Sequence, residues 1–168
     1  MRPQILVFFA IIILFSLQTC GIYSFSGINI PPGIKTIQVK NFENLANGGP
    51  PNMAQNFTEG LRQYYQNNSS LAVVPTNGDY ILEGNLVTYR LSPIATTGND
   101  QSGGNRLTIE VEVKFTNTQD KTKDFKQKFS FYNDFPQNQS LSQVENELID
   151  NIFKQLFLDI FNKTLSDW

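Results

Sequence analysis

The sequence LTIEVEVKFTNTQDKTKDFKQKFSF, residues 107–131, decides the fold. Apolar and polar side chains alternate in two segments, which a polar turn near residues 119–122 separates. Successive side chains of a β-strand point to opposite faces, so this alternation is typical of strands with one buried and one solvated face. We therefore expect residues 107–116 and 125–131 to form an antiparallel hairpin. The predicted buried side chains are Leu107, Ile109, Val111, Val113 and Phe115, followed by Phe125, Phe129 and Phe131.

Three further elements are predicted before this hairpin. Residues 34–42 alternate as a strand, and apolar residues at helical spacing predict a helix over residues 52–66. Residues 80–94 predict a long strand in which the alternation changes parity, and Gly84 is the expected position of a β-bulge. A polar, glycine-rich loop is expected over residues 95–105.

The C-terminal part of the chain predicts one long helix, residues 141–165. Its apolar face is so wide that it must lie on a sheet or be shared with a partner protein. Ser140 and Gln143 have the spacing of a capping box at its start. The predicted order is β-α-β-β-β-α, which makes the fold class α+β: a two-layer sandwich with a mainly antiparallel sheet and two helices packed on one face.

The first twenty residues have the pattern of an export signal. Residues 5–17 form an apolar run after Met1-Arg2, and as a helix the run would be roughly 20 Å long, shorter than a ~30 Å hydrocarbon core. This pattern predicts a secretory signal peptide instead of a membrane span. Leu17 stands three residues before Cys20, as in bacterial lipoprotein signals, in which the cysteine is lipidated and becomes the first residue of the mature chain. The alternative is a plain secretory signal that ends near a cysteine.

The predicted domain organisation follows from this reading. Residues 1–19 are the lipoprotein signal peptide, residues 20–33 are the lipidated cysteine and a tether rich in Gly, Ser and Pro, and residues 34–168 are one α+β domain. Cys20 is the only cysteine, so acylation explains its thiol. Each buried CH₂ contributes ~0.8 kcal/mol and one chain binds only marginally, so stable attachment to the membrane requires several acyl chains, such as palmitate.

Composition excludes several classes of function. The chain has 13 basic and 15 acidic residues, which gives no support to nucleic-acid binding. It has no histidine, which removes the commonest general base and the commonest metal ligand. Glu110 and Glu112 are the nearest approach to a catalytic pair, but they lie two residues apart on a solvated strand face. We therefore expect no enzyme activity, no metal site and no cofactor.

Several short segments resemble one family along nearly the whole chain. They are CGIYSFSG at residues 20–27, IPPGIKT at 30–36, NRLTI at 105–109, VKFTN at 113–117, KDF at 123–125, DIFNK at 159–163 and the terminal Trp168. The chain thereby resembles the LptE-type LPS-assembly lipoproteins of the Bacteroidetes branch. The resemblance implies an outer-membrane lipoprotein that faces the periplasm. It implies a non-catalytic subunit of the LPS translocon, which plugs the LptD β-barrel, helps to assemble it and assists LPS insertion into the outer leaflet.

Two groups of basic residues are candidates for contacts with LPS phosphates. Lys114, Lys126 and Lys128 point to the exposed face of the predicted hairpin, although Glu110 and Glu112 share that face. Ion pairing across the strands, at ~0.2–1 kcal/mol per pair, is the favoured alternative reading of these lysines. The second group is Arg90 and Arg106, which bracket residues 91–105, the end of the predicted strand and its loop, since arginine can bind phosphate bidentately.

A second class of function remains open. Residues 37–44, IQVKNFEN, precede a helix and resemble CsgG- and LpoB-like lipoproteins, which act in secretion or activate cell-wall synthases. A lipid-anchored hydrolase is a third reading, but the chain lacks any nucleophile and base arrangement. Trp168 either contacts a partner or closes the core.

Overall fold

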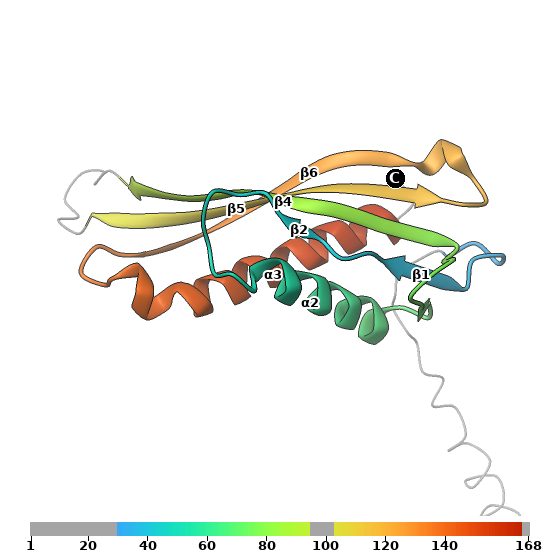
Figure 1. Ribbon diagram of the computed structural model, residues 1–168, viewed down its shortest axis with the longest axis horizontal. Helices are drawn as coiled ribbons and strands as arrows, with labels where there is room; N and C mark the ends of the chain where they lie inside the picture. The colour runs from blue at the N-terminus through green and yellow to red at the C-terminus, as the bar shows by residue number, and fades with distance from the viewer. Residues whose placement is uncertain (1–29, 95–102, 166–168) are drawn as a thin grey trace, which may run out of the picture.

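The computed structural model describes residues 30–94 and 103–165 and shows a mixed sheet of six strands with two helices on one face (Figure 1). The predicted signal peptide, Cys20, most of the 95–105 loop and Trp168 lie outside the described residues. The elements are β1 (Thr36–Val39), β2 (Glu43–Asn44), α2 (Met53–Asn68), β3 (Ala72–Val73), β4 (Tyr80–Ile94), β5 (Gly104–Asn117), a 3₁₀ turn (Lys121–Lys123), β6 (Phe125–Pro136) and α3 (Leu141–Leu165). The fold class, α+β with both helices on one side of the sheet, is confirmed.

Three long antiparallel strands form most of the sheet. The strand order is β3-β1-β4-β5-β6, with β2 beside β4, and β5 pairs with both β4 and β6 in antiparallel register. Ile109 lies opposite Tyr89 on one side and Phe131 on the other. The predicted buried face of β5 is confirmed, since Leu107, Ile109, Val111 and Val113 are 0% exposed. The short strands add parallel pairs at the β4 edge of the sheet, where β1 pairs with β3 and β4, and β2 pairs with β4. The sheet is therefore mixed.

The predicted bulge exists but was placed at the wrong residue. The register between β4 and β5 shifts between Leu86 and Thr88, so the extra residue is Val87 and not Gly84. Gly84 has a different role, because a Cβ there would lie 2.1 Å from the carbonyl oxygen of Glu112 and 2.7 Å from the ring of Phe42. The glycine therefore allows a close approach of β4 to its neighbours.

The first predicted strand, residues 34–42, is divided into β1 and β2. Lys40 still donates its N–H to the carbonyl of Leu82 at 2.8 Å, but the N–H of Phe42 bonds the Thr58 hydroxyl on α2 at 3.0 Å. Phe42 is 4% exposed, so the bend buries an aromatic ring. Because a backbone donor turns from the sheet to the helix, the strand cannot continue through this point.

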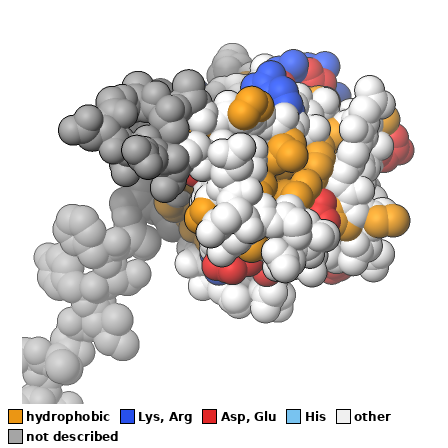
Figure 2. All heavy atoms as spheres, turned by 90° about the vertical axis from the view of Figure 1, so that its left-hand side faces the viewer, with side chains coloured by type: hydrophobic (Ala, Val, Ile, Leu, Met, Phe, Trp, Pro, Cys, Tyr) orange, Lys and Arg blue, Asp and Glu red, His pale blue; other side chains and the backbone are white. Residues whose placement is uncertain are grey.

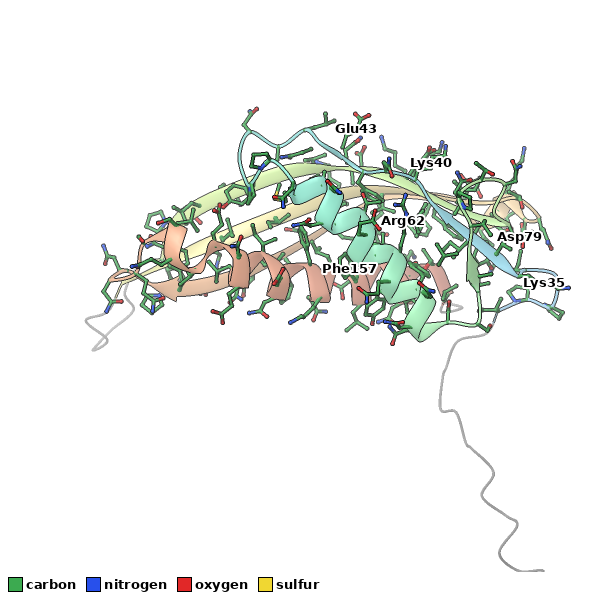
Figure 3. The ribbon with its side chains drawn as sticks, turned by 60° about the horizontal axis from the view of Figure 1, so that its bottom comes forward. Lys35, Lys40, Glu43, Arg62, Asp79 and Phe157 are labelled. Atoms are coloured by element: carbon green, nitrogen blue, oxygen red, sulfur yellow. The ribbon has the colours of Figure 1, made fainter. Side chains whose placement is uncertain are left out.

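Aromatic side chains fill the space between the two helices and the sheet. Phe57 of α2 lies 5.0 Å from Phe42, 5.0 Å from Phe153 and 5.1 Å from Phe157, measured between ring centroids. Phe157 points from α3 toward α2 (Figure 3), and a Cβ at Gly60 would lie 2.7 Å from its ring. The absence of a side chain at Gly60 therefore allows the two helices to pack closely.

Polar contacts hold the ends of these elements. Oδ2 of Asp79 accepts bonds from the N–H of Lys35 at 2.9 Å, and from the N–H and hydroxyl of Thr36 at 2.9 and 2.7 Å (Figure 3). These bonds, led by that from the Lys35 N–H, lower the pKa of Asp79 and join β1 to the start of β4. At the start of α3, Gln143 Oε1 accepts the Ser140 N–H at 3.2 Å, which is half of the predicted capping box.

Candidate functional site

The face of the sheet opposite the helices is the candidate binding surface, and we call it the open face. It carries the side chains of β5 and β6 that alternate with the buried ones, from Arg106 to Lys114 and from Lys126 to Asp134. Figure 2 views the molecule from the end that carries the tip of the β4–β5 hairpin. Basic and acidic side chains gather along the sheet side at the top of this view, and hydrophobic side chains occupy the middle.

The three candidate lysines lie together on the open face, and each has a carboxylate partner. Lys126 bonds Glu112 at 2.8 Å and Lys128 bonds Glu110 at 2.9 Å, so the predicted pairing across the strands is present. Lys114 bonds Glu83 of β4 at 2.7 Å. The structure therefore places the three lysines in ion pairs, and their contact with LPS stays a prediction.

Glu83 connects a lysine of β5 with a lysine in the segment that follows β1. Its two carboxylate oxygens accept from Lys114 and from Lys40, each at 2.7 Å. The bond from Lys114, followed by that from Lys40, lowers the pKa of Glu83, and the same contact raises the pKa of Lys114. Lys114 also lies directly opposite Lys126 in the β5–β6 ladder, where like charges repel each other. The glutamates on either side offset this repulsion.

A shallow groove of about 330 Å³ runs beside these ion pairs. It lies between the chain that follows β1 and the first half of β4, and extends to the end of β5 and the start of β6. Its lining residues are Lys40, Asn41, Glu43, Glu83, Gly84, Asn85, Glu112, Lys114 and Lys126. The lining is charged with both signs, so the groove suits a polar partner that can exchange ion pairs with it.

Arg106 makes a bidentate contact of the kind that was predicted for a phosphate, but its partner is a carboxylate. Its Nε and Nη2 donate to Oδ1 and Oδ2 of Asp134 at 2.7 and 2.8 Å, and its guanidinium lies 3.6 Å from the ring centroid of Tyr132. The bond from Arg106 lowers the pKa of Asp134. Arg90 is exposed on β4, opposite Thr108, and makes no ion pair with any residue that the structure describes. A phosphate at Arg106 would have to replace Asp134.

The predicted basic residues form two groups on the same face. Arg90 and Arg106 lie near the tip of the β4–β5 hairpin, whereas Lys114, Lys126 and Lys128 lie toward its other end. In the β5–β6 ladder Lys128 lies opposite Glu112, which is six residues from Arg106, about 20 Å at ~3.4 Å per residue. We therefore treat the arginines and the lysines as two candidate sites.

The structure also shows residues that the sequence reasoning missed. Lys40 and Glu83 join the lysine group, and strand parity over residues 80–94 could have placed Glu83 on the solvated face. Tyr132 and Asp134 were missed because the last strand was predicted to end at residue 131, whereas β6 continues to Pro136.

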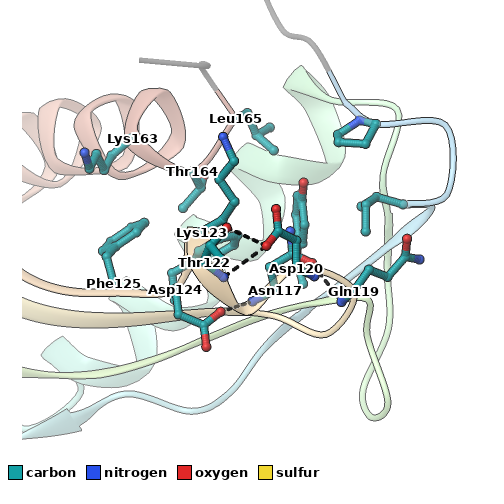
Figure 4. A pocket seen from close by; sticks show the side chains of 14 residues that line it. Asn117, Gln119, Asp120, Thr122, Lys123, Asp124, Phe125, Lys163, Thr164 and Leu165 are labelled. Carbon is teal, nitrogen blue, oxygen red and sulfur yellow. Dashed lines mark hydrogen bonds between the residues drawn. The ribbon is translucent and has the colours of Figure 1, made fainter.

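A larger pocket, of about 500 Å³, lies at the end of the molecule opposite the tip of the β4–β5 hairpin (Figure 4). Phe115, Phe125 and Leu165 contribute apolar surface, and polar residues surround them. The polar side chains bond mainly to their own turn, since Asp124 accepts the Asn117 N–H at 2.7 Å and Asp120 accepts the Thr122 N–H at 3.0 Å. Lys121 and Lys123 are in the 3₁₀ turn at this end of the sheet, and Lys123 lines the pocket.

Over residues 30–94 and 103–165, none of the helices has the length and apolar character needed to span a membrane. In the same residues there is no cluster of acidic side chains arranged to hold a metal ion.

Comparison with known proteins identifies a family over most of the chain. A family model described as "LptE: Lipopolysaccharide-assembly" matches residues 34–164. This range covers both helices and every strand of the described domain. No curated protein matches the chain.

Similar solved structures come from several bacteria. A hypothetical protein from Chlamydia trachomatis is 7% identical with a TM-score of 0.52, and covers 80% of this chain and 99% of its own. A protein from Xanthomonas campestris is 11% identical with a TM-score of 0.52, and covers 82% and 90%. A minor lipoprotein from Acinetobacter baumannii is 14% identical with a TM-score of 0.48, and covers 79% and 97%. At these identities the first two show a shared fold and nothing more.

Proposed function

The chain belongs to the LptE family of lipopolysaccharide-assembly proteins, and we propose that it is the lipid-anchored, non-catalytic subunit of an outer-membrane LPS translocon. In this role it faces the periplasm, plugs an LptD-type β-barrel, helps that barrel to assemble and assists LPS insertion into the outer leaflet. The observation that carries the proposal is the family match over residues 34–164.

The anchor is the first part of the proposal. Cys20 is the only cysteine of the chain and follows a short apolar run at the spacing of a lipoprotein signal. Its acyl chains would hold the domain at the membrane through the tether, residues 20–33. Mass spectrometry of the mature N-terminus should find cleavage before Cys20 and an acylated sulfur. An unmodified thiol in a freely secreted product would contradict this part of the proposal.

The open face is the second part. The helices bury one face of the sheet, so the other face is free to contact a barrel wall or LPS. Its ion pairs are exposed and exchange partners at small cost, because surface pairs contribute only ~0–1 kcal/mol. LPS phosphates could replace Asp134 at Arg106, or a glutamate beside Lys114, Lys126 and Lys128. The two groups would then contact different parts of the same large lipid or two molecules in sequence.

Depletion and co-purification test the proposal as a whole. Depletion should lower the amount of LPS at the cell surface, and the detergent-extracted chain should co-purify with a large β-barrel. A CsgG- or LpoB-like role would instead produce a defect in secretion or in cell-wall synthesis with normal surface LPS. Isolation of the chain from native membranes without any barrel would count against the proposed partner.

The arginine group can be tested separately from the fold. Replacing both Arg90 and Arg106 with Ala should reduce LPS delivery to the surface and leave the unfolding transition nearly unchanged, since both side chains lie on the open face. A control variant, Arg62→Ala, removes an arginine of α2 that donates to the Val39 carbonyl at 2.8 Å (Figure 3). That variant should lower stability and leave LPS contact at the open face intact. Normal surface LPS in the double variant would remove Arg90 and Arg106 as a site.

A further inference from the structure

Strand β6 forms an unusually long edge of the sheet. It has 12 residues and, within the part of the chain that the structure describes, pairs with one strand only, β5. Its ladder with β5 runs one residue to one residue from Phe125 to Pro136 without a bulge. Proteins commonly protect such edges with short strands, bulges or internal proline, because an open edge offers unpaired backbone groups to another strand. β6 has its proline only at the last position.

The side chains of β6 are arranged as a self-complementary series about Ser130. Residues at equal distances before and after Ser130 are either alike in chemistry or complementary, as a cation is to an anion or to an aromatic ring. The matched pairs are Phe129 with Phe131, Lys128 with Tyr132, Gln127 with Asn133, Lys126 with Asp134, and Phe125 with Phe135. In an antiparallel pair of two identical strands centred on Ser130, each of these residues would lie directly opposite its match on the same face.

We propose that β6 is a self-association surface, at which two copies of this chain join edge to edge with Ser130 at the twofold axis. The two sheets then form one continuous sheet whose central pair of strands is antiparallel. This state goes beyond the assembly role proposed above, since it concerns chains that are not engaged with a barrel, and it would cover an edge that is otherwise exposed to aggregation.

Charge complementarity along the strand favours a second copy over an unrelated partner. The positive charges of β6, Lys126 and Lys128, lie before Ser130, and its negative charge, Asp134, lies after it. Antiparallel pairing places Lys126 opposite Asp134 of the second copy, twice in each dimer. Lys128 would face the ring of Tyr132 of the second copy, which attracts cations as the ring already attracts Arg106. Parallel pairing would oppose like charges instead.

The pairing also extends the ion pairs of the open face. Lys126 already bonds Glu112, and Asp134 already bonds Arg106. In the dimer these pairs would be connected across the axis into one row of alternating charge. On the opposite side of the strand, Phe129 is 7% exposed and packs with the core, so the matched Phe129 and Phe131 would extend the apolar layer across the axis.

Single cysteine substitutions in the full membrane-anchored chain test the register directly. In Ser130→Cys the two introduced thiols lie opposite each other, with Cα atoms ~4.5–5.5 Å apart, which is within the range of a disulfide. In Gln127→Cys the thiols lie six residues out of register, about 20 Å apart at ~3.4 Å per residue. Ser70→Cys introduces an exposed thiol after α2, far from β6.

The proposal expects mild oxidation of membranes to convert most of the Ser130→Cys chain into a product of twice the mass of one chain. Gln127→Cys and Ser70→Cys should yield several times less of that product. All variants share Cys20, so the comparison does not depend on whether Cys20 is acylated. Equal yields from the three variants, or a Ser130→Cys product of another mass that contains a different protein, would overturn the proposal.

A measurement on the unsubstituted full chain completes the test. After detergent extraction without a barrel partner, sedimentation should show a monomer that converts to a dimer as the concentration rises. Lys126→Asp places two carboxylates opposite each other at both ends of the paired strands, so the transition should move to higher concentration. A dimer that forms equally well in Lys126→Asp would contradict the register centred on Ser130.

Discussion

The two faces of strand β5 differ in almost every physical respect although they alternate along one stretch of chain. Ile109, Val111 and Val113 are 0% exposed beneath the helices, whereas Glu110 and Glu112 form ion pairs in solvent. Burial of apolar area stabilises the first set by about 1.5–3 kcal/mol per side chain, and exposed pairs contribute only ~0–1 kcal/mol. The buried face therefore determines stability, while the open face can bind a partner at little cost to the fold.

The largest expected effect comes from truncating the buried face. Ile109→Ala removes a fully buried side chain between Tyr89 and Phe131 and should lower the free energy of unfolding by about 2–5 kcal/mol. Glu110→Ala, the next residue, should lower it by less than about 1 kcal/mol. Urea unfolding of both variants measures the difference. Similar losses in the two variants would break the distinction between the faces.

The helix layer provides the next largest effect. Gly60→Ala places a Cβ 2.7 Å from the ring of Phe157, which packs against Phe57. Overpacking of this kind costs about 1–3 kcal/mol and exceeds the gain in helix propensity, which is at most about 1 kcal/mol. We expect a net loss of stability, with partial recovery in the double variant Gly60→Ala and Phe157→Leu. Increased stability in Gly60→Ala would show that the helix contact is looser than described.

Acid should reduce the stability that the ion pairs of the open face contribute, by a smaller amount than the two substitutions above. The ion pairs that Glu83 makes with Lys114 and then with Lys40 lower the pKa of Glu83 from its ordinary value of 4.5. A carboxylate with a lowered pKa contributes stability that is present above its unfolded-state pKa and is lost as the pH falls through its folded-state pKa. The stability difference between the parent chain and Glu83→Gln should therefore be present at pH 7 and decline below about pH 4.5. A difference that persists unchanged at acidic pH would exclude these ion pairs as its source.

The sequence predicts the buried side of this comparison well. The alternation in residues 107–116 and the apolar stripe of residues 141–165 are strong local signals, and the structure confirms both elements. The position of the bulge at Val87 and the break between β1 and β2 were not predictable in the same way. The bulge depends on pairing with a distant strand, and the break depends on the Thr58 hydroxyl of α2.

The open side is harder to predict because its contacts join residues far apart in sequence. Glu110 and Glu112 could be paired with lysines of the neighbouring strand from alternation alone. Glu83 comes from β4 and Lys40 from the segment that follows β1, and their contact depends on the full sheet order. The fold alone does not predict a phosphate contact at any of these charges, since ion pairs and phosphate contacts use the same side chains.

Site-specific photocrosslinking in cells tests the role of the open face most directly. A photoreactive residue in place of Lys128, on the open face, is compared with one in place of Asn151, an exposed residue of α3. We expect the probe at position 128 to form adducts with LPS or with the β-barrel and the probe at position 151 to form few or none. Adducts with LPS or the barrel that arise mainly from position 151 would contradict a role of the open face in binding.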